Sequence, residues 1–230
     1  MPVLPAMPPY DLTRDSAGVR DLRHVLRDTG VTVDLVYPFT MTGRTIVADF
    51  EPALAAAAEL GAPLANVLCY DREPQRRVER LGELAALAAG HGIALAVEFY
   101  APSQVASLVA ALDTVAAVAC DGVGVTLDLL HLMRAGEWPL MASRLADPAI
   151  RIVQVSDGPG AMAADRIEWE AGLQRWLPGE GGFPIAQVLA GMDASVPVSV
   201  EVPQQSAIEA GIPMLDRVRM AVAAMTRAQG

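Results

Sequence analysis

Short β-branched segments alternate with amphipathic or Ala-rich segments along this 230-residue chain, and that alternation limits the possible folds more than any other feature. Apolar runs bounded by glycine or proline predict strands over residues 31–37, 66–70, 93–100, 122–129, 150–156 and 196–202. Helical spacing predicts helices within 18–29, 49–60, 75–89, 104–118, 132–145, 166–175, 184–192 and 213–227. Strands that alternate with helices pair in parallel through right-handed crossovers. The sequence therefore predicts an α/β fold of the TIM-type (β/α) barrel class.

The number of strands falls short of a complete barrel, which has eight. The segment before Gly18 is Pro-rich and could supply the tail of one more strand around Val3 and Leu4. We therefore expect one barrel domain over residues 1–230, with six to seven strands and without the first βα unit. A late start codon, a shortened chain and a genuinely open barrel are alternative explanations. An open barrel exposes two strand edges, which favours a homodimer.

Composition argues against nucleic acid and membrane as partners of this chain. The net charge of −10 argues against a nucleic-acid partner, because phosphate backbones are bound by basic surfaces. No apolar run reaches the roughly 18 residues of a membrane span, and the N-terminus lacks the pattern of a signal peptide. We expect a cytoplasmic protein in which Cys69 and Cys120 are buried free thiols.

Four expected strands carry a carboxylate or an amide close to their ends, where an apolar strand does not normally place one. They are Glu98, Asp128, Gln154 and Glu201. Such groups are costly to bury unless they are paired or bind a metal. The C-terminal ends of barrel strands converge on one site, so we expect these side chains to meet there. Three carboxylates and an amide suit Mn²⁺ or Mg²⁺ better than Zn²⁺, although Zn²⁺ is possible.

An Asp-x-x-His unit joins Asp128 to His131 at the end of one expected strand. The imidazole can carry a proton, donate to a substrate oxygen or act as a further ligand. His24 and His91 lie away from strand ends and are given no role. Asp157 follows the strand that contains Gln154. It is a candidate for substrate binding, and it can also orient a neighbour or cap the following loop.

The Gly-rich stretch Leu-Pro-Gly-Glu180-Gly-Gly follows the next helical piece. Its glycines let the backbone approach a ligand closely, which makes Glu180 a candidate for substrate binding. Arg166 and Arg175 lie upstream and could hold a substrate hydroxyl, carboxylate or phosphate. Solvated arginines on a helix face are an equally good interpretation.

The joint order of these motifs resembles the xylose isomerase-like TIM-barrel superfamily, in particular its sugar phosphate isomerase/epimerase type. The resemblance covers residues 20–230. The stretches that carry it are Val-Thr-Leu-Asp-Leu-Leu-His, Val-Gln-Val-Ser-Asp, Leu-Pro-Gly-Glu-Gly-Gly and Val-Ser-Val-Glu-Val-Pro.

The resemblance implies a divalent metal held by Glu98, Asp128, Gln154 and Glu201. It also implies that Glu98 and Glu201 exchange a proton next to a substrate carbonyl, while His131 and Arg166 bind substrate oxygens. Most members of the family have His where this chain has Gln154, and the missing first βα unit is a second departure. The implied function is a metal-dependent isomerase or epimerase of a sugar, polyol or keto-sugar derivative.

Three alternatives remain open at this point. The same proton abstraction would serve dehydration of a keto-inositol, or chemistry on a small hydroxy acid. A DNA-repair endonuclease of the same superfamily would need a His-rich multi-zinc site, whereas this chain has three histidines and is acidic. A catalytically impaired member that binds a ligand or partner is favoured by Gln154 and by the short N-terminus.

Overall fold

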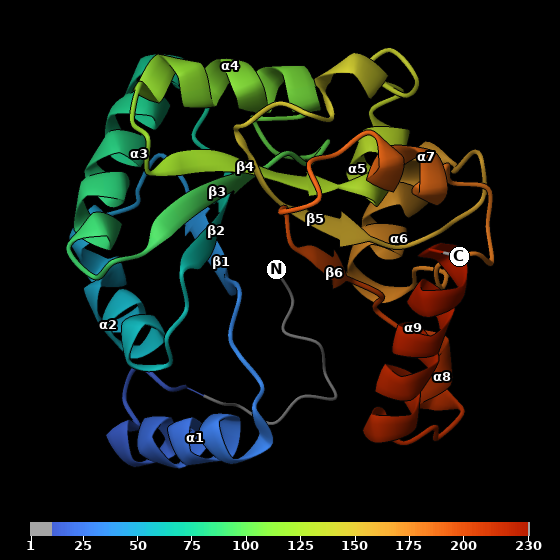
Figure 1. Ribbon diagram of the computed structural model, residues 1–230. Coiled ribbons are helices and arrows are strands. Elements are labelled where there is room, and N and C mark those ends of the chain that lie inside the picture. Colours follow the sequence, from blue (N-terminus) through green and yellow to red (C-terminus); the bar gives the residue numbers. More distant parts are fainter. Residues whose placement is uncertain (1–10, 230) are drawn as a thin grey trace. The chain divides into compact units, whose positions relative to one another are not determined.

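The computed structural model of the chain describes residues 11–229, in which helices alternate with parallel strands (Figure 1). The chain divides into two compact units. The first runs up to Glu98 and adds Leu112–Gly124, and the second comprises Phe99–Ala111 and the chain from Val125 onward. The strands follow chain order, with β1, β2 and β3 in the first unit and β4, β5 and β6 in the second. This arrangement agrees with the predicted α/β class.

The strands of the first unit are β1 (Val36–Met41), β2 (Leu64–Cys69) and β3 (Ala94–Glu98). They pair in parallel, and Leu68 of β2 lies opposite Glu98 of β3. The helical elements of this unit, in chain order, are α1 (Ser16–Thr29), the 3₁₀ turn η1 (Val47–Phe50), α2 (Glu51–Glu59), α3 (Pro74–Ala89) and most of α4 (Leu108–Val118, of which the first four residues belong to the second unit). Helices α2 and α3 lie beside the three strands (Figure 1).

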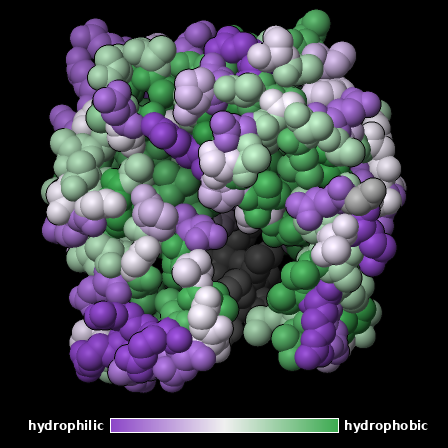
Figure 2. Space-filling view, viewed as in Figure 1, coloured by the Kyte–Doolittle hydropathy of each residue, from purple (hydrophilic) through white to green (hydrophobic). Residues whose placement is uncertain are grey.

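Helix α3 shows how local sequence fixes these elements. Glu73 caps its first turn by accepting hydrogen bonds from the backbone N–H groups of Gln75 and Arg76, and Pro74 fits the first helical position. Its buried face is spaced for a helix and consists of Leu81, Leu84, Ala85 and Ala88. The amphipathic pattern thus turns one side of α3 toward the core. Helix α1 buries only Val19, and hydrophilic residues gather over it (Figure 2).

The second unit contains β4 (Val123–Asp128, of which the first two residues belong to the first unit), β5 (Ile150–Val155) and β6 (Val198–Val200). Gln154 lies opposite Asp128 on one side and opposite Ser199 on the other. The remaining elements are α5 (Leu129–Arg134), η2 (Ala142–Arg144), η3 (Ala164–Arg166), α6 (Ile167–Leu173), α7 (Ile185–Ala190), α8 (Gln205–Glu209) and α9 (Met214–Gln229).

The first strand is displaced from its predicted position. The sequence predicts a strand over 31–37 that ends before Pro38. In the structure, β1 covers Val36–Met41 and includes that proline. Proline cannot donate to a strand ladder, but β1 pairs with β2 through a register shift between Val36 and Phe39. The irregular pairing explains how a proline is accommodated here.

Helix boundaries differ in two further places. The helix expected over 132–145 is two short pieces, because α5 begins directly after Asp128 and ends before Gly136, whose φ of +69° is incompatible with a continuing helix. Helix α8 was not expected from the sequence. The expected strand tail around Val3 and Leu4 lies outside the described residues. Within residues 11–229, no helix is both long and apolar enough to cross a membrane.

Candidate functional site

Three of the polar strand-end residues lie at the C-terminal ends of the strands of the second unit. Asp128 is the last residue of β4, and Gln154 is its partner in β5. Glu201 directly follows β6, and its backbone N–H donates to the carbonyl of Val155 at 3.1 Å. Asp128 and Gln154 are buried, and Glu201 is half-buried. The three residues thus occupy one end of β4, β5 and β6, as the sequence predicted.

The two oxygens of Asp128 have different tasks. Oδ1 accepts hydrogen bonds from the backbone N–H groups of Leu130 (2.7 Å) and His131 (3.3 Å), and so it caps the first turn of α5. Oδ2 lies 2.7 Å from Nη1 of Arg175 and 3.5 Å from Nε2 of His131. Burial raises the pKa of Asp128, but attraction to Arg175 and His131 outweighs it, so the pKa lies below its ordinary value.

Arg175 links two acids at this end of the strands. Its Nη1 lies 2.7 Å from Asp128 and 3.4 Å from Oε2 of Glu201, while its Nε donates to the carbonyl of Ala171 at 3.1 Å. The side chain is only 3% exposed, so its charge is shielded from water and acts strongly on both carboxylates. Sequence reasoning named Arg175 as a possible substrate-binding residue, but it did not anticipate this double contact.

His131 lies on the first turn of α5, and its imidazole is buried. The ring of Tyr100 lies 4.9 Å from the imidazole, measured between centroids, at an interplanar angle of 51°. This packing and the Asp128 carboxylate fix the imidazole at the end of β4. Tyr100 was missed at the sequence level, because an aromatic residue after a strand is more often part of the core.

The Oε1 atom of Gln154 is buried and has no hydrogen-bond partner among residues 11–229. A buried acceptor without a partner is costly unless something else binds it. An amide oxygen is a suitable ligand for a hard divalent cation, as are the neighbouring carboxylates. The donor set of the second unit therefore fits an oxygen-bound divalent metal.

Glu98 belongs to the first unit, where it ends β3 and is buried. Its Oε2 accepts a hydrogen bond from Nδ2 of Asn66, a fully buried residue of the neighbouring strand β2. Asn66 was also missed, although a single amide inside the apolar run Leu-Ala-Asn-Val-Leu is a recognisable exception. Asn66 therefore holds the side chain of Glu98 in one orientation.

Asp157 organises the Gly-rich loop. Its carboxylate accepts hydrogen bonds from the backbone N–H groups of Gly158, Gly179 and Phe183 at 2.8–3.0 Å. A side chain at Gly181 would collide with Asp157 and Gly158, so only glycine fits there. The contacts agree with the expectation that Asp157 orients the segment around it.

Glu180 and Arg166 lie apart from the buried groups. Glu180 is exposed, and its Oε2 accepts from the N–H of Leu177 at 3.3 Å. Arg166 is exposed and stacks on its neighbour Trp169, with 3.9 Å from the guanidinium carbon to the ring centroid. The structure therefore brings Arg175, rather than Arg166, to Asp128. Cys69 is buried as expected, but Cys120 is exposed, which corrects the prediction that both thiols are buried.

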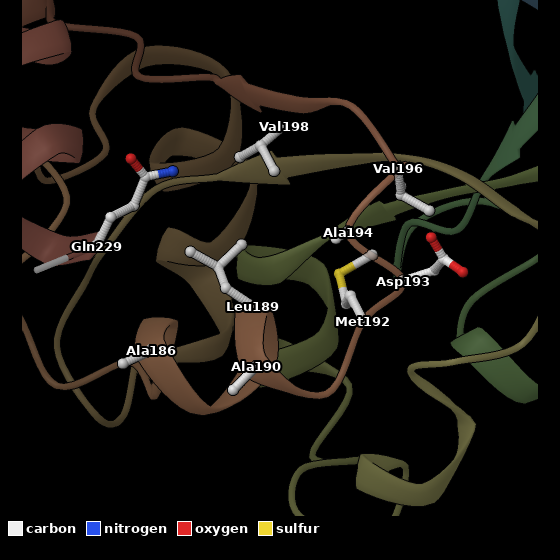
Figure 3. A pocket seen from close by; sticks show the side chains of 9 residues that line it. All are labelled: Ala186, Leu189, Ala190, Met192, Asp193, Ala194, Val196, Val198 and Gln229. Atoms are coloured by element: carbon white, nitrogen blue, oxygen red, sulfur yellow. The ribbon is translucent and has the colours of Figure 1, made fainter.

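A separate pocket of about 360 Å³ is lined by α7, the segment before β6 and the end of α9 (Figure 3). Leu189 points toward Val198, Met192 points toward Ala194, and the lining is mostly apolar (Figure 3). Val196 precedes β6 and Glu201 follows it, so this pocket lies at the opposite end of the strand from the polar residues. In barrel enzymes that opposite end serves stability rather than catalysis.

Comparison with solved structures supports the fold class. An IolI protein with a bound zinc atom has a TM-score of 0.76 and 17% identity, over 94% of this chain and 82% of that one. A D-psicose 3-epimerase with D-tagatose from Clostridium cellulolyticum H10 has a TM-score of 0.72 and 17% identity, over 96% and 84%. At these identities the likeness shows the fold alone. A search of curated proteins gives no match.

A third solved structure reaches higher identity over part of its length. It is a xylose isomerase-like TIM barrel/4-hydroxyphenylpyruvate dioxygenase fusion protein, with a TM-score of 0.71 and 25% identity over 81% of this chain. The present chain spans about a third (32%) of that fusion protein. The sequence profile of one family matches residues 3–218, nearly the whole chain. The chain therefore belongs to the xylose isomerase-like TIM barrel family.

Proposed function

We propose that this chain is a metal-dependent isomerase or epimerase that moves a proton next to the carbonyl of a sugar, polyol or keto-sugar derivative. The observation that carries the proposal is the buried Oε1 of Gln154, which has no hydrogen-bond partner in residues 11–229 and lies at the same strand ends as Asp128 and Glu201. A divalent cation would satisfy this oxygen and neutralise the acids around it.

The proposed ligand set adds Glu98 to Asp128, Gln154 and Glu201. Glu98, Asp128 and His131 are buried residues of the types that can hold a metal ion. Chain continuity supports the inclusion of Glu98, because it is only two residues from Tyr100, whose ring packs on His131. The similar IolI structure contains a zinc atom, which supports the binding of a divalent metal without indicating which one.

A divalent metal bound by the proposed ligands would supply Lewis acidity toward the carbonyl of a substrate. The chain's own residues supply the proton chemistry. Glu98 and Glu201 act as the acid and base, and Asn66 keeps the Glu98 carboxylate oriented. Arg175 lies 3.4 Å from Oε2 of Glu201 and places a positive charge beside the proposed base.

Substrate oxygens would be bound by His131, whose imidazole is fixed by Asp128 and Tyr100. Asp157 would act indirectly, by holding the Gly-rich loop that follows Arg175 in the chain. Glu180 and Arg166 stay proposals for substrate binding, since both are exposed and could turn toward a ligand. The similar structure of a D-psicose 3-epimerase contains D-tagatose, which supports a sugar as the substrate.

The test is metal binding followed by proton exchange. Wild-type protein freed of metal is titrated with Mn²⁺, Mg²⁺ and Zn²⁺ beside Glu201→Gln, with the exposed Glu83→Gln on α3 as a control of equal charge change. We expect one stoichiometric metal in wild type and control, and weakened binding in Glu201→Gln. Keto-sugars incubated in deuterated water should then take up deuterium next to the carbonyl only with the loaded wild type and the control.

A second candidate is a ligand-binding protein without turnover. The observation that favours it is the pairing of Arg175 with both Asp128 and Glu201, because a resident guanidinium already neutralises two of the proposed ligands. Ligand binding with neither metal uptake nor deuterium exchange would support this candidate and overturn the enzyme proposal.

A further inference from the structure

Arginines gather after β1 and β2 in the first unit. The seventeen basic residues are all arginine, in a chain of net charge −10. Residues 42–45 and 70–80 together contain five arginines and three acids. These segments therefore carry a net positive charge, although the chain as a whole is acidic. We call this set the arginine patch; it consists of Arg44, Arg72, Arg76, Arg77 and Arg80.

A buried carboxylate organises the patch. Asp71 follows β2 and is 1% exposed; it binds Arg76 through two hydrogen bonds of 2.6 and 2.7 Å. Arg80 lies 3.6 Å from the same carboxylate, and Arg77 donates to the carbonyl of Asp71 at 2.8 Å. One acid therefore positions three guanidinium groups, and only one of their three positive charges is balanced by it.

The loop after β1 closes against these arginines. Arg80 donates to the carbonyl of Thr42 at 3.0 Å, and a side chain at Gly43 would lie 3.1 Å from Nη2 of Arg76. Arg44 is the next residue of the same loop and is exposed. Of the two other acids of the segment, Glu73 caps α3 at the N–H groups of Gln75 and Arg76, and Glu79 accepts from Gln75 at 2.9 Å.

Unused donors remain in the patch. Arg44 and Arg72 are exposed and form no ion pair with any residue from 11 to 229. The Nε–H of Arg77 is buried and has no hydrogen-bond partner in that same part of the chain. A buried donor without a partner is unfavourable, and an anion is the ligand that several arginine donors bind best.

The register of the first unit places the patch near Glu98. Glu98 of β3 lies opposite Leu68 of β2, and both strands run in the same direction. Asp71 is three residues beyond Leu68, which is at most about 10 Å of extended chain. Glu98 and the patch therefore share one end of the strands, at a separation that a small acyclic or cyclic sugar derivative can bridge.

We propose that the arginine patch binds the anionic group, a phosphate or a carboxylate, of a substrate whose reacting carbon lies at Glu98. This inference deepens the proposed function, because it assigns the substrate to the anionic sugar derivatives. Guanidinium groups bind either anion through paired hydrogen bonds, and the five arginines offer more than one such pair. Binding at the patch needs no metal and can be measured without turnover.

The test uses calorimetric titration of metal-free protein, prepared with a chelating resin so that no chelator anion competes. The probes are inorganic phosphate, D-gluconate and uncharged sorbitol, at low salt because surface charges are screened by salt. Wild type is compared with Arg44→Gln/Arg72→Gln, which changes two exposed arginines. The control is Arg20→Gln/Arg23→Gln on α1, which removes the same charge from exposed positions of the same unit.

We expect saturable binding of an anionic probe to wild type and control, weakened about tenfold in Arg44→Gln/Arg72→Gln, and no binding of sorbitol. Preference for phosphate would identify a phosphorylated substrate, and preference for gluconate a sugar acid. Equal affinity in all three proteins, equal loss in both double variants, or no anion binding would overturn the inference. A Mn²⁺ titration of the same samples separates the two proposals, since the patch variants should keep wild-type metal affinity.

Discussion

Nη1 of Arg175 lies 2.7 Å from Oδ2 of Asp128, a side chain with no exposed surface. The two residues are 47 positions apart, and the contact joins the end of β4 to the segment after α6. Removal of one partner from a buried ion pair leaves an isolated charge in a medium of low polarity. The stability of the second unit is therefore sensitive to the loss of either partner.

Replacement of Arg175 by Met should lower the free energy of unfolding by about 3 kcal/mol in metal-free protein, because Asp128 loses its buried counter-charge. Urea denaturation monitored by circular dichroism measures the change. The matched control is Arg166→Met at an exposed arginine, which should cost less than about 1 kcal/mol through its lost stacking on Trp169. Equal stability of the two variants would contradict this account of the pair.

Gln154→His should raise the affinity for Zn²⁺ by about tenfold or more, because imidazole is a better ligand for zinc than an amide oxygen. Competition with a chromophoric chelator measures the affinity. Gln187→His, on helix α7, is the control for an added histidine and should leave zinc affinity unchanged. No gain in Gln154→His would mean that this side chain does not face the metal.

Asp157→Ala should loosen the Gly-rich loop, since the carboxylate accepts hydrogen bonds from Gly179 and Phe183. We expect a stability loss of about 2 kcal/mol, together with faster hydrogen exchange at those two amides. Asp165→Ala, at an exposed position with no ion pair to another described residue, provides the comparison. Unchanged exchange at Gly179 would disprove the role of Asp157 in the loop.

The arginines around Asp71 also predict a dependence of stability on pH. The hydrogen bonds from Arg76 hold the pKa of Asp71 at about 2, below the value of about 3.9 expected for the unfolded chain. The contribution of Asp71 is therefore fully present above pH 4 and is lost as the pH falls toward 2. The stability difference between wild type and Asp71→Asn should shrink over that range in acid titrations followed by fluorescence. A constant difference from pH 7 to 2 would contradict the assignment.

The two thiols should react differently with alkylating reagents. Burial raises the pKa of Cys69 to about 12, whereas Cys120 is exposed. Only a thiolate reacts quickly, so iodoacetamide at pH 8 should modify Cys120 and leave Cys69 intact in folded protein. Peptide mass spectrometry before and after denaturation distinguishes the sites. Early modification of Cys69 would show that β2 opens far more readily than its burial indicates.

Sequence reasoning predicted the alternation of elements well, because glycine and proline mark most boundaries and the buried strands are mostly apolar. It placed Glu98 and Asp128 at strand ends for the same reason, since a charge that ends an apolar run is conspicuous. It failed at β1, where the strand passes through Pro38. Local sequence does not show that the pairing of β1 with β2 shifts register and so accommodates a proline.

Contacts between residues that are distant in sequence could not be predicted either. The pairing of Arg175 with Asp128 and Glu201 depends on the path of a long loop, and the ring contact of Tyr100 with His131 depends on packing. Neither leaves a periodic pattern in the chain. The metal, the dimer and the cytoplasmic location stay predictions that the experiments above, light scattering and cell fractionation can test.

The divided use of the Asp128 carboxylate limits how this chain can be altered. One oxygen starts helix α5 and the other faces Arg175, so the direction of the helix and the charge at the strand ends depend on a single side chain. Asparagine would keep the cap and lose the charge, and glutamate would keep the charge but displace the cap. Engineers who redesign substrate preference on this scaffold should leave position 128 fixed and vary the surrounding loops.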